Sequence, residues 1–345
     1  MAGSRGRSST GSTRHDFTLR EAVRRTLPVI AGLVLRRLLV GIGTLFFVSI
    51  IVFLGTQVLP GDAAQIRMGQ DATPENVAAL RTRLGLDQPL HVQYLSWLGG
   101  FVSGNLGMSL ANEAPVADMI AARWYNTVVV ALLTASVAVP VSVALGLLAA
   151  MWPGSAFDRS LTVFNVALVA SPEFFVATCL VAVFVLSLNM GAAVVVGSAE
   201  GKSLFGLLQH FIYPVLTLAI VTSSQMIRMT RAALLNVLTA PYVEMATLKG
   251  VPRRRLVLRH ALPNAVGPIV NVIALNLAYL ISGVVVVEVY FSYPGLAVLM
   301  VQAVQTRDFI VVQTIGMMFC GAYVAIILVA DIVAILSNPR LRYPK

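Results

Sequence analysis

Long apolar runs separated by shorter polar segments organise most of this chain. Six runs are long enough to cross a bilayer as helices, since about 18 nearly uncharged residues suffice. They are Leu38–Val58, Thr127–Ala150, Leu161–Leu188, Phe211–Met226, Val266–Val287 and Phe309–Leu336. The fourth is the least apolar, because Thr222, Ser223 and Ser224 lie near its end. The pattern predicts an all-α polytopic membrane protein with six transmembrane helices.

Composition and charge support this prediction and orient the chain. Hydrophobic residues make up 57% of it and charged residues only 12%, with a mean hydropathy of +0.83. A soluble protein could not bury so much apolar surface. Six spans place 19 of the 25 Lys and Arg on the side that holds both termini, which is the cytoplasmic side by the positive-inside rule. We therefore interpret the net charge of +10 as an orientation signal beside a lipid bilayer, and expect no nucleic-acid binding.

The polar segments divide the chain further. Residues 1–35 are rich in Ser, Gly, Thr and Arg, and we expect a flexible basic cytosolic extension before a transmembrane domain over residues 36–345. Residues 59–126 predict an extracytoplasmic helical segment. Its first helix has Thr73 as N-cap, Pro74 at its start, and Gly85 as its stop.

A second helix of that segment would carry Tyr94, Trp97 and Leu98 at helical spacing, which is typical of a helix near the membrane interface.

Two carboxylates lie inside predicted spans, where ionisable groups are costly and are functional candidates. Glu173, beside Pro172, either lines a translocation path or is a hydrogen-bonded carboxyl packed between helices, and both interpretations stay open. Asp331 lies close enough to the cytosolic interface to pair with Arg340 or Arg342.

The remaining chemistry is sparse. Cys179 and Cys320 lie within predicted spans, and we expect both to be small buried apolar side chains rather than a disulfide or metal site. The sequence contains no HExxH, GxSxG or Walker pattern. We therefore expect no catalytic residues, no metal and no cofactor in this chain.

Residues 228–265 hold the densest cationic run, with Lys249, Arg253, Arg254, Arg255 and Arg259. The pattern predicts a helix interrupted near Pro241, with an apolar surface formed by Val243, Met245 and Ala246. Gly250 would stop that helix and Pro252 would start a second one, giving a rigid cytosolic knob. A basic anchor on anionic lipid would explain the arginines but not the spacing of Glu244, Ala246 and Gly250.

Within this loop, Glu244-Met245-Ala246, three further residues, Gly250, and then Leu262-Pro263 resemble the EAA loop of ABC-importer permeases. The chain departs from the pattern at Met245, where Ala is usual, and at His260, where Ile is usual.

Other stretches resemble the peptide/nickel branch of that family, closest to its dipeptide-permease B-like subunit. They are Arg36–Asp62, Leu84–Leu110, Arg228–Leu238, Val287–Phe309 and the closing NPRLRYPK, so the resemblance covers about residues 36–345. Asn105 and Asn338 stand where Asp is more common.

The resemblance implies a type I ABC importer permease fold in a bacterial inner (plasma) membrane. It implies as partners a homologous second permease, two ATPase subunits that bind ATP and Mg, and an extracytoplasmic substrate-binding protein. It also implies roles for individual residues. The residues that would couple the permease to the ATPase are Glu244, Ala246, Gly250, Leu262 and Pro263. Arg228 and Arg231 would support the loop by holding it to the bundle or to lipid headgroups. Pro294 and Gly295 would form an external gate.

Di- and oligopeptides are the substrates that the resemblance favours, with nickel chelates, haem, opines and sugars as alternatives. Two other classes fit less well. An ion-coupled carrier would need more intramembrane charge or repeated broken helices, and an intramembrane hydrolase would need a nucleophile and a base.

Overall fold

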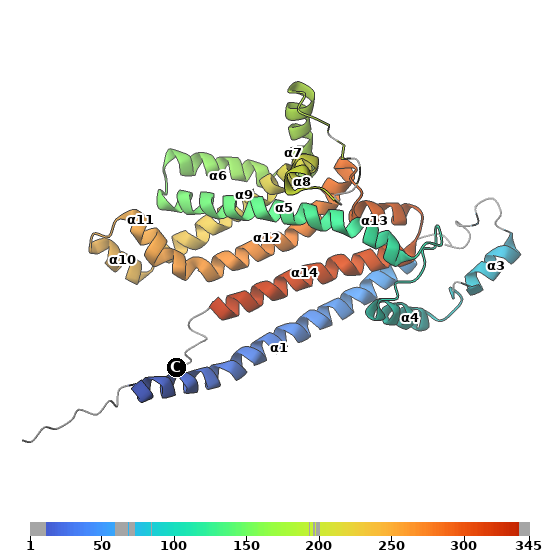
Figure 1. The fold of residues 1–345 in the computed structure, drawn as a ribbon, viewed down its shortest axis with the longest axis horizontal. Coiled ribbons are helices and arrows are strands. Elements are labelled where there is room, and N and C mark those ends of the chain that lie inside the picture. The colour runs from blue at the N-terminus through green and yellow to red at the C-terminus, as the bar shows by residue number, and fades with distance from the viewer. Residues whose placement is uncertain are drawn as a thin grey trace, which may run out of the picture.

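Helices form nearly all of the described chain (Figure 1). The structure, a computed structural model, describes residues 12–58, 68, 73–83, 85–192, 194–195, 197 and 201–337. In chain order the elements are α1 (Ser12–Val58), α3 (Pro74–Arg83), α4 (Leu90–Ser103), α5 (Val116–Met151), α6 (Ala156–Val169), α7 (Glu173–Leu180), η2 (Val181–Ser187), α8 (Leu204–His210), α9 (Ile212–Leu238), α10 (Pro241–Leu248), α11 (Arg253–Arg255), η3 (Leu256–Ala261), α12 (Leu262–Phe291), α13 (Leu296–Gln305) and α14 (Phe309–Ser337). The elements η2 and η3 are π-helical.

Four helices of the described chain are long and apolar enough to cross a membrane. They are Ala31–Gln57 within α1, all of α5, Arg253–Phe291 from α11 to the end of α12, and Phe309–Val333 within α14. They run roughly side by side in Figure 1, with α1 against α14 and α14 against α12. The first, second, fifth and sixth predicted spans are thereby confirmed as membrane-length helices.

The third predicted span is not one helix. It divides into α6 and the α7–η2 segment, which are bent by 111° at residues 170–172. Pro172 has an extended backbone with φ −64° and ψ 149°, and a proline disfavours helical conformation in the residue before it. Glu173 therefore begins a new helix instead of lying in the middle of a continuous one.

The bend also overturns the expectation for Cys179. The α7–η2 arm points away from the other helices (Figure 1), so part of its surface has no neighbour within the chain. Cys179 is exposed there, while Cys320 on α14 is partly buried.

The fourth predicted span, Phe211–Met226, falls on α9, which begins at Ile212 and continues to Leu238. This helix is not among those of the described chain that are apolar enough to count as membrane spans. It packs against α5, α6, α7 and α12, so its polar face is turned towards other helices. The Ser223 hydroxyl donates to the Ala138 carbonyl at 3.5 Å, and a methyl group added at Gly146 would lie 2.9 Å from Thr230. Small and hydroxylated residues let membrane helices approach closely, which explains why α9 is less apolar than a lipid-facing span.

The helices α3 and α4 follow the predicted pattern. The Thr73 hydroxyl accepts a hydrogen bond from the Asn76 amide at 3.3 Å, and Gly85 ends the segment with φ +68°. On α4, Tyr94 and Trp97 pack against Phe53 of α1. These aromatic side chains therefore join α4 to α1, and a cavity of about 480 Å³ lies between α1, the α3–α4 segment and α14.

Asp331 has a partner that was not predicted. Its carboxylate lies 3.0 Å from the Arg37 guanidinium of α1, whereas Arg340 and Arg342 lie outside the described residues. Because α1 and α14 are adjacent, this pair joins the first and last long helices. A sequence separation of almost 300 residues hid it from local reasoning.

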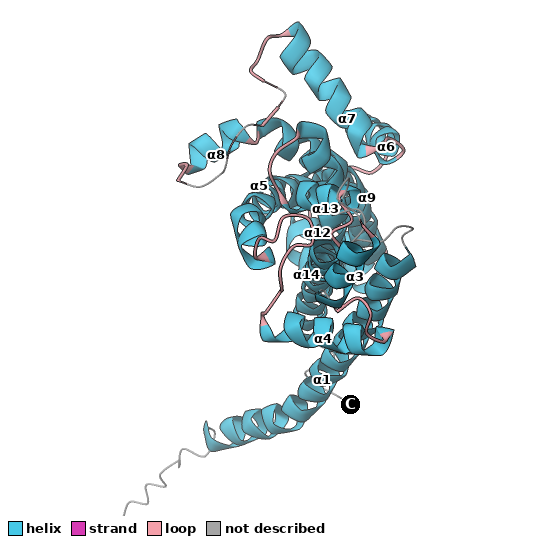
Figure 2. Cartoon of the chain, turned by 90° about the vertical axis from the view of Figure 1, so that its right-hand side faces the viewer, coloured by secondary structure: helices cyan, strands magenta, loops and turns pink. Residues whose placement is uncertain are grey.

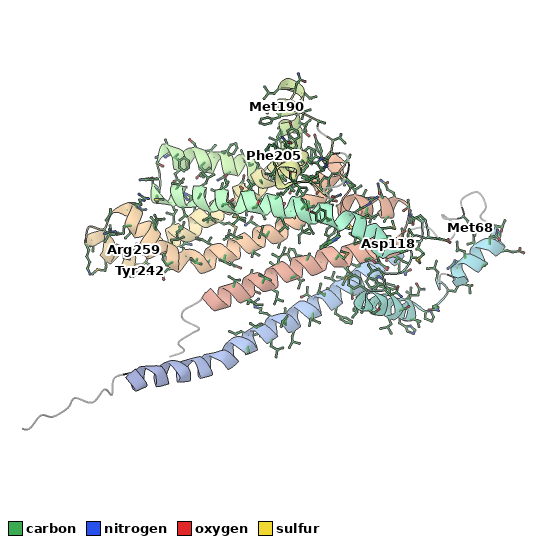
Figure 3. All side chains as sticks on the ribbon, in the orientation of Figure 1. Met68, Asp118, Met190, Phe205, Tyr242 and Arg259 are labelled. Carbon is green, nitrogen blue, oxygen red and sulfur yellow. The ribbon has the colours of Figure 1, made fainter. Side chains whose placement is uncertain are left out.

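The bundle has two ends, which we name by the short helices found there. Tyr242 and Arg259 lie at the α10 end in Figure 3, and Asp118, in the first turn of α5, lies at the opposite α13 end. Figure 2 views the molecule from the α13 end.

Candidate functional site

The α10 helix at one end of the bundle presents apolar side chains outward. Pro241 opens it, as proline at the first helical position should, and Val243 is buried. Tyr242, Met245 and Leu248 are exposed, Leu248 by 76%. Val243 thus fastens α10 to the bundle. The sequence pattern had placed it on the apolar surface with Met245 and Ala246, and that placement is wrong for Val243. An exposed group of large apolar side chains on a polar segment is typical of a protein-binding surface.

Glu244 and Ala246 lie on the same helix. Glu244 is in the first turn of α10, where its negative charge complements the helix dipole, and its side chain is exposed. Ala246 is partly buried. The α10 surface therefore combines a carboxylate with apolar groups.

Gly250 ends this helix in a Schellman motif. The Gly250 amide donates to the Thr247 carbonyl at 2.9 Å, and the Val251 amide donates to the Ala246 carbonyl at 3.2 Å. This geometry requires a left-handed residue, and Gly250 has φ +74°. A Cβ added there would meet nothing within 4 Å, so the backbone conformation, and not crowding, is what calls for glycine.

The predicted second short helix is instead the start of a long one. Pro252 caps α11, which passes through η3 directly into α12. Pro263 has no N–H for regular helical hydrogen bonding, and the π-helical turn lies immediately before α12. Leu262 packs on a buried cluster that contains Ala150 and Leu234, while Pro263 is exposed. The bend at Gly250 is therefore attached directly to a membrane-length helix.

Arg253 donates hydrogen bonds to backbone carbonyls at the end of α5. Its Nε donates to the Met151 carbonyl at 3.1 Å and its Nη2 to the Ala150 carbonyl at 3.4 Å. These carbonyls belong to the last turn of α5, where they have no partner within the helix and where a cation complements the dipole. At least one arginine of the cationic run thus has a structural contact that a simple lipid anchor would not require.

Arg231 is fixed to the bundle. Its guanidinium binds both carboxylate oxygens of the buried Asp158, at 2.6 and 2.8 Å. Asp158 also accepts from the Gly154 amide at 2.8 Å, so α9 is joined to the α5–α6 turn. The hydrogen bonds to Asp158 raise the pKa of Arg231 above its usual value. Arg228 is exposed and donates to Gln225 of its own helix at 2.7 Å.

At the α13 end, Pro294 and Gly295 form a packed junction and not an open turn. The Asn126 amide of α5 donates to the Pro294 carbonyl at 2.8 Å. Gly295 is buried, and a Cβ there would lie 2.3 Å from the carboxylate of Glu288. No side chain fits at this position.

Glu288 is the centre of that junction and was not foreseen. Its fully buried carboxylate accepts hydrogen bonds from the Thr127 hydroxyl at 2.5 Å, the Ala297 amide at 2.7 Å and the Tyr293 hydroxyl at 3.3 Å. Burial, together with the charge of Glu288, raises the pKa of Tyr293 well above its usual range, so this hydroxyl remains a donor.

Glu173 lies beside α12. Its carboxylate accepts a hydrogen bond from the Tyr279 hydroxyl at 3.0 Å, and further along the same pair of helices Tyr290 donates to Thr178 at 3.0 Å. Tyr279, Tyr290 and Thr178 are exposed in this chain. A polar strip therefore follows the contact between α7 and α12.

Comparison with known proteins identifies the chain. Residues 142–343 match the family described as "Binding-protein-dependent transport system inner membrane component", and residues 30–131 match the N-terminal domain of such membrane components. The chain belongs to this family of importer permeases. The glutathione transport system permease protein GsiC of Escherichia coli O6:H1 is 37% identical over 310 residues, which cover 90% of this chain and 98% of that relative. GsiC of Escherichia coli K12 and of Shigella dysenteriae serotype 1 are each 36% identical with the same coverage.

This permease is a membrane-embedded transport subunit of an ABC importer of the dipeptide/oligopeptide type, and it is not itself an enzyme. Permeases of this family work with a second permease, ATPases and a binding protein. The resemblance and the type I fold expected from the sequence are confirmed, and neither the ion-coupled carrier nor the intramembrane hydrolase applies. Within the described residues, no group of three or more His, Cys, Asp or Glu could hold a metal ion.

The sequence contains signals for Asp158 and Glu288, two buried carboxylates that were not predicted as functional residues. Ser155 and Asp158 form an S-x-x-D capping pattern, and the Ser155 hydroxyl accepts from the Asp158 amide at 3.2 Å. Glu288 precedes a Pro-Gly turn and a new helix, whose first amides need acceptors. Neither signal names the distant partners, Arg231 and Thr127.

Proposed function

We propose that this permease forms half of a translocation path for di- and oligopeptides delivered by a substrate-binding protein. The peptide class is favoured by the relatives, whose names specify glutathione, a small peptide. We further propose that the α10 end, and with it both termini, faces the cytoplasm, because that side would then hold most of the Lys and Arg.

The observation that carries the proposal is the surface of α10. It offers exposed Tyr242, Met245 and Leu248 beside the carboxylate of Glu244, on a helix held at a fixed angle by Gly250. Such a surface fits a groove in a cytosolic ATPase, so α10 is the coupling helix. Ala246 allows close approach, while Leu262 and Pro263 attach the bend to α12. Arg231, through Asp158, supports the loop from α9, and Arg228 adds a positive charge near the headgroups.

The function is tested by reconstitution. The permease is assembled in proteoliposomes with the second permease and ATPases encoded beside it and the neighbouring binding protein. ATP-dependent uptake is measured for glutathione, a panel of di- and oligopeptides, nickel chelates, haem, an opine and a sugar. Uptake of peptides alone supports the proposal. Uptake of a non-peptide class alone would contradict the proposed substrate class but not the function as an importer.

Glu244→Lys is expected to abolish ATP-dependent uptake without reducing membrane insertion. Placing a cation in the first turn of α10 costs only about 0.3–1 kcal/mol through the helix dipole, too little to unfold the bundle. The loss would instead reflect repulsion at the ATPase surface. Co-purification of the ATPases with the variant and with Glu244→Gln measures docking directly. Normal docking and uptake by Glu244→Lys would contradict the assignment of α10.

Glu173 is proposed to line the translocation path. A carboxyl group and three polar neighbours facing acyl chains would be costly, so the strip along α7 and α12 suits a water-filled path. Glu173→Gln is expected to lower peptide uptake, because it removes the only carboxylate of the strip. Tyr279→Phe, which removes the hydrogen bond but keeps the carboxyl group, is expected to have a smaller effect. Equal uptake by Glu173→Gln and the unmodified permease would indicate a carboxyl that only packs between helices.

A further inference from the structure

The antiparallel helices α5 and α12 are clasped together at two points, one at the α10 end and one towards the α13 end. At the α10 end, Arg253 binds the carbonyls of Ala150 and Met151 in the last turn of α5. Arg253 is the first residue of α11, which continues through η3 into α12. At the α13 end, Glu288, in the last turn of α12, binds the Thr127 hydroxyl of α5 at 2.5 Å. From Leu262, the first residue of α12, to Glu288 the helix spans about 40 Å.

The outer clasp includes the turn that follows α12. The Thr127 hydroxyl, which donates to Glu288, accepts from the Leu296 amide at 2.9 Å, and the Ala297 amide donates to Glu288 at 2.7 Å. The first amides of α13 thus find acceptors on both α12 and α5. Gly295 packs directly against the Glu288 carboxylate, so the turn and the start of α13 are fixed to α5 and α12.

Each helix of the pair has a point at which it could bend. Pro140 lies inside α5 and Pro268 inside α12, and proline removes a hydrogen bond from the helical ladder. Held at one end only, the two helices could flex separately at these positions. Held at both ends, they must move together.

We propose that α5 and α12 act as one lever, in which Arg253 and Glu288 are positioning residues that carry movement of the ATPase-docked loop to the outer turn at residues 292–298. This inference rests on the proposed docking of α10. The lever requires both clasps. If either clasp is opened, movement of the docked loop no longer reaches the outer turn.

The test is a double-variant comparison in the complete reconstituted transporter, with peptide uptake per ATP hydrolysed as the readout. Arg253→Met and Glu288→Gln are each expected to lower this ratio about tenfold while ATP hydrolysis continues. The double variant is expected to be no worse than the worse single variant. Independent defects at sites about 40 Å apart would instead multiply, to about a hundredfold loss. A multiplied loss would overturn the lever, as would uptake and ATP hydrolysis that fall in the same proportion.

Four further variants make this test decisive. Arg159→Met removes an exposed arginine of α6 near the same end of the bundle and is expected to leave the ratio unchanged. Arg253→Lys, which can still bind a carbonyl, is expected to restore part of the loss. If Glu288→Gln does not assemble, Thr127→Val opens the same clasp while leaving the carboxylate its amide donors. Normal uptake by Gly250→Val would contradict the docking proposal. If Gly250→Val abolishes uptake while the losses of the two clasp variants multiply, only the lever is contradicted.

Discussion

Replacing Gly250 with valine is expected to abolish ATP-driven uptake while the permease still inserts into the membrane. Gly250 has φ +74°, and for an L-residue this left-handed conformation costs about 1–2 kcal/mol, more for a β-branched side chain. Since 1.4 kcal/mol is a factor of about ten in a population, most molecules would leave the Schellman bend. The angle between α10 and α12 would change, and α10 would no longer meet its ATPase groove. Uptake and insertion are measured on the same membranes.

Gly267→Val is the matched control for this substitution. Gly267 lies within α12, does not have a left-handed backbone, and has no atom within 4 Å of an added Cβ. Its replacement is therefore expected to leave uptake close to normal. Normal uptake by Gly250→Val, or an equal loss in both glycine variants, would be inconsistent with a conformational role for Gly250.

Arg231→Met is expected to destabilise the assembled permease more than any other single loss of an arginine in the loop. It leaves the buried Asp158 carboxylate without its cation, and breaking a buried ion pair typically costs about 3–5 kcal/mol. Because the Arg231 side chain is 29% exposed, water can reach the site, and we expect roughly 1–3 kcal/mol. The midpoint of thermal aggregation of the purified complex measures this loss.

Two companion variants identify its cause. Arg231→Met combined with Asp158→Asn removes both charges and is expected to recover much of the lost stability, since no uncompensated charge stays buried. Arg228→Met, which removes an exposed arginine from the same helix, is expected to change stability by less than about 0.5 kcal/mol. Equal destabilisation by the two arginine variants would show that the Asp158 pair is not what holds α9 to α6.

The sequence by itself determined the class of protein, the places of its four membrane-length helices, and the chemistry of the loop between α9 and α12. These features depend on local composition and spacing. The stop at Gly250, the start at Pro241 and the cap at Thr73 follow from the dihedral preferences and hydrogen-bonding capacity of single residues. The resemblance to importer permeases also rested on local motifs, and for that reason it could be recognised along most of the chain.

Tertiary structure decided what depends on contacts between distant residues. Hydropathy could not show that the third span is bent by 111°, because both halves are apolar and only the backbone at Pro172 separates them. It could not pair Asp331 with Arg37, Arg231 with Asp158, or Glu288 with Thr127, since each pair joins different helices. A buried charge needs a partner, but periodicity along one helix does not say which other helix supplies it. Packing alone placed these partners, and with them the two clasps between α5 and α12.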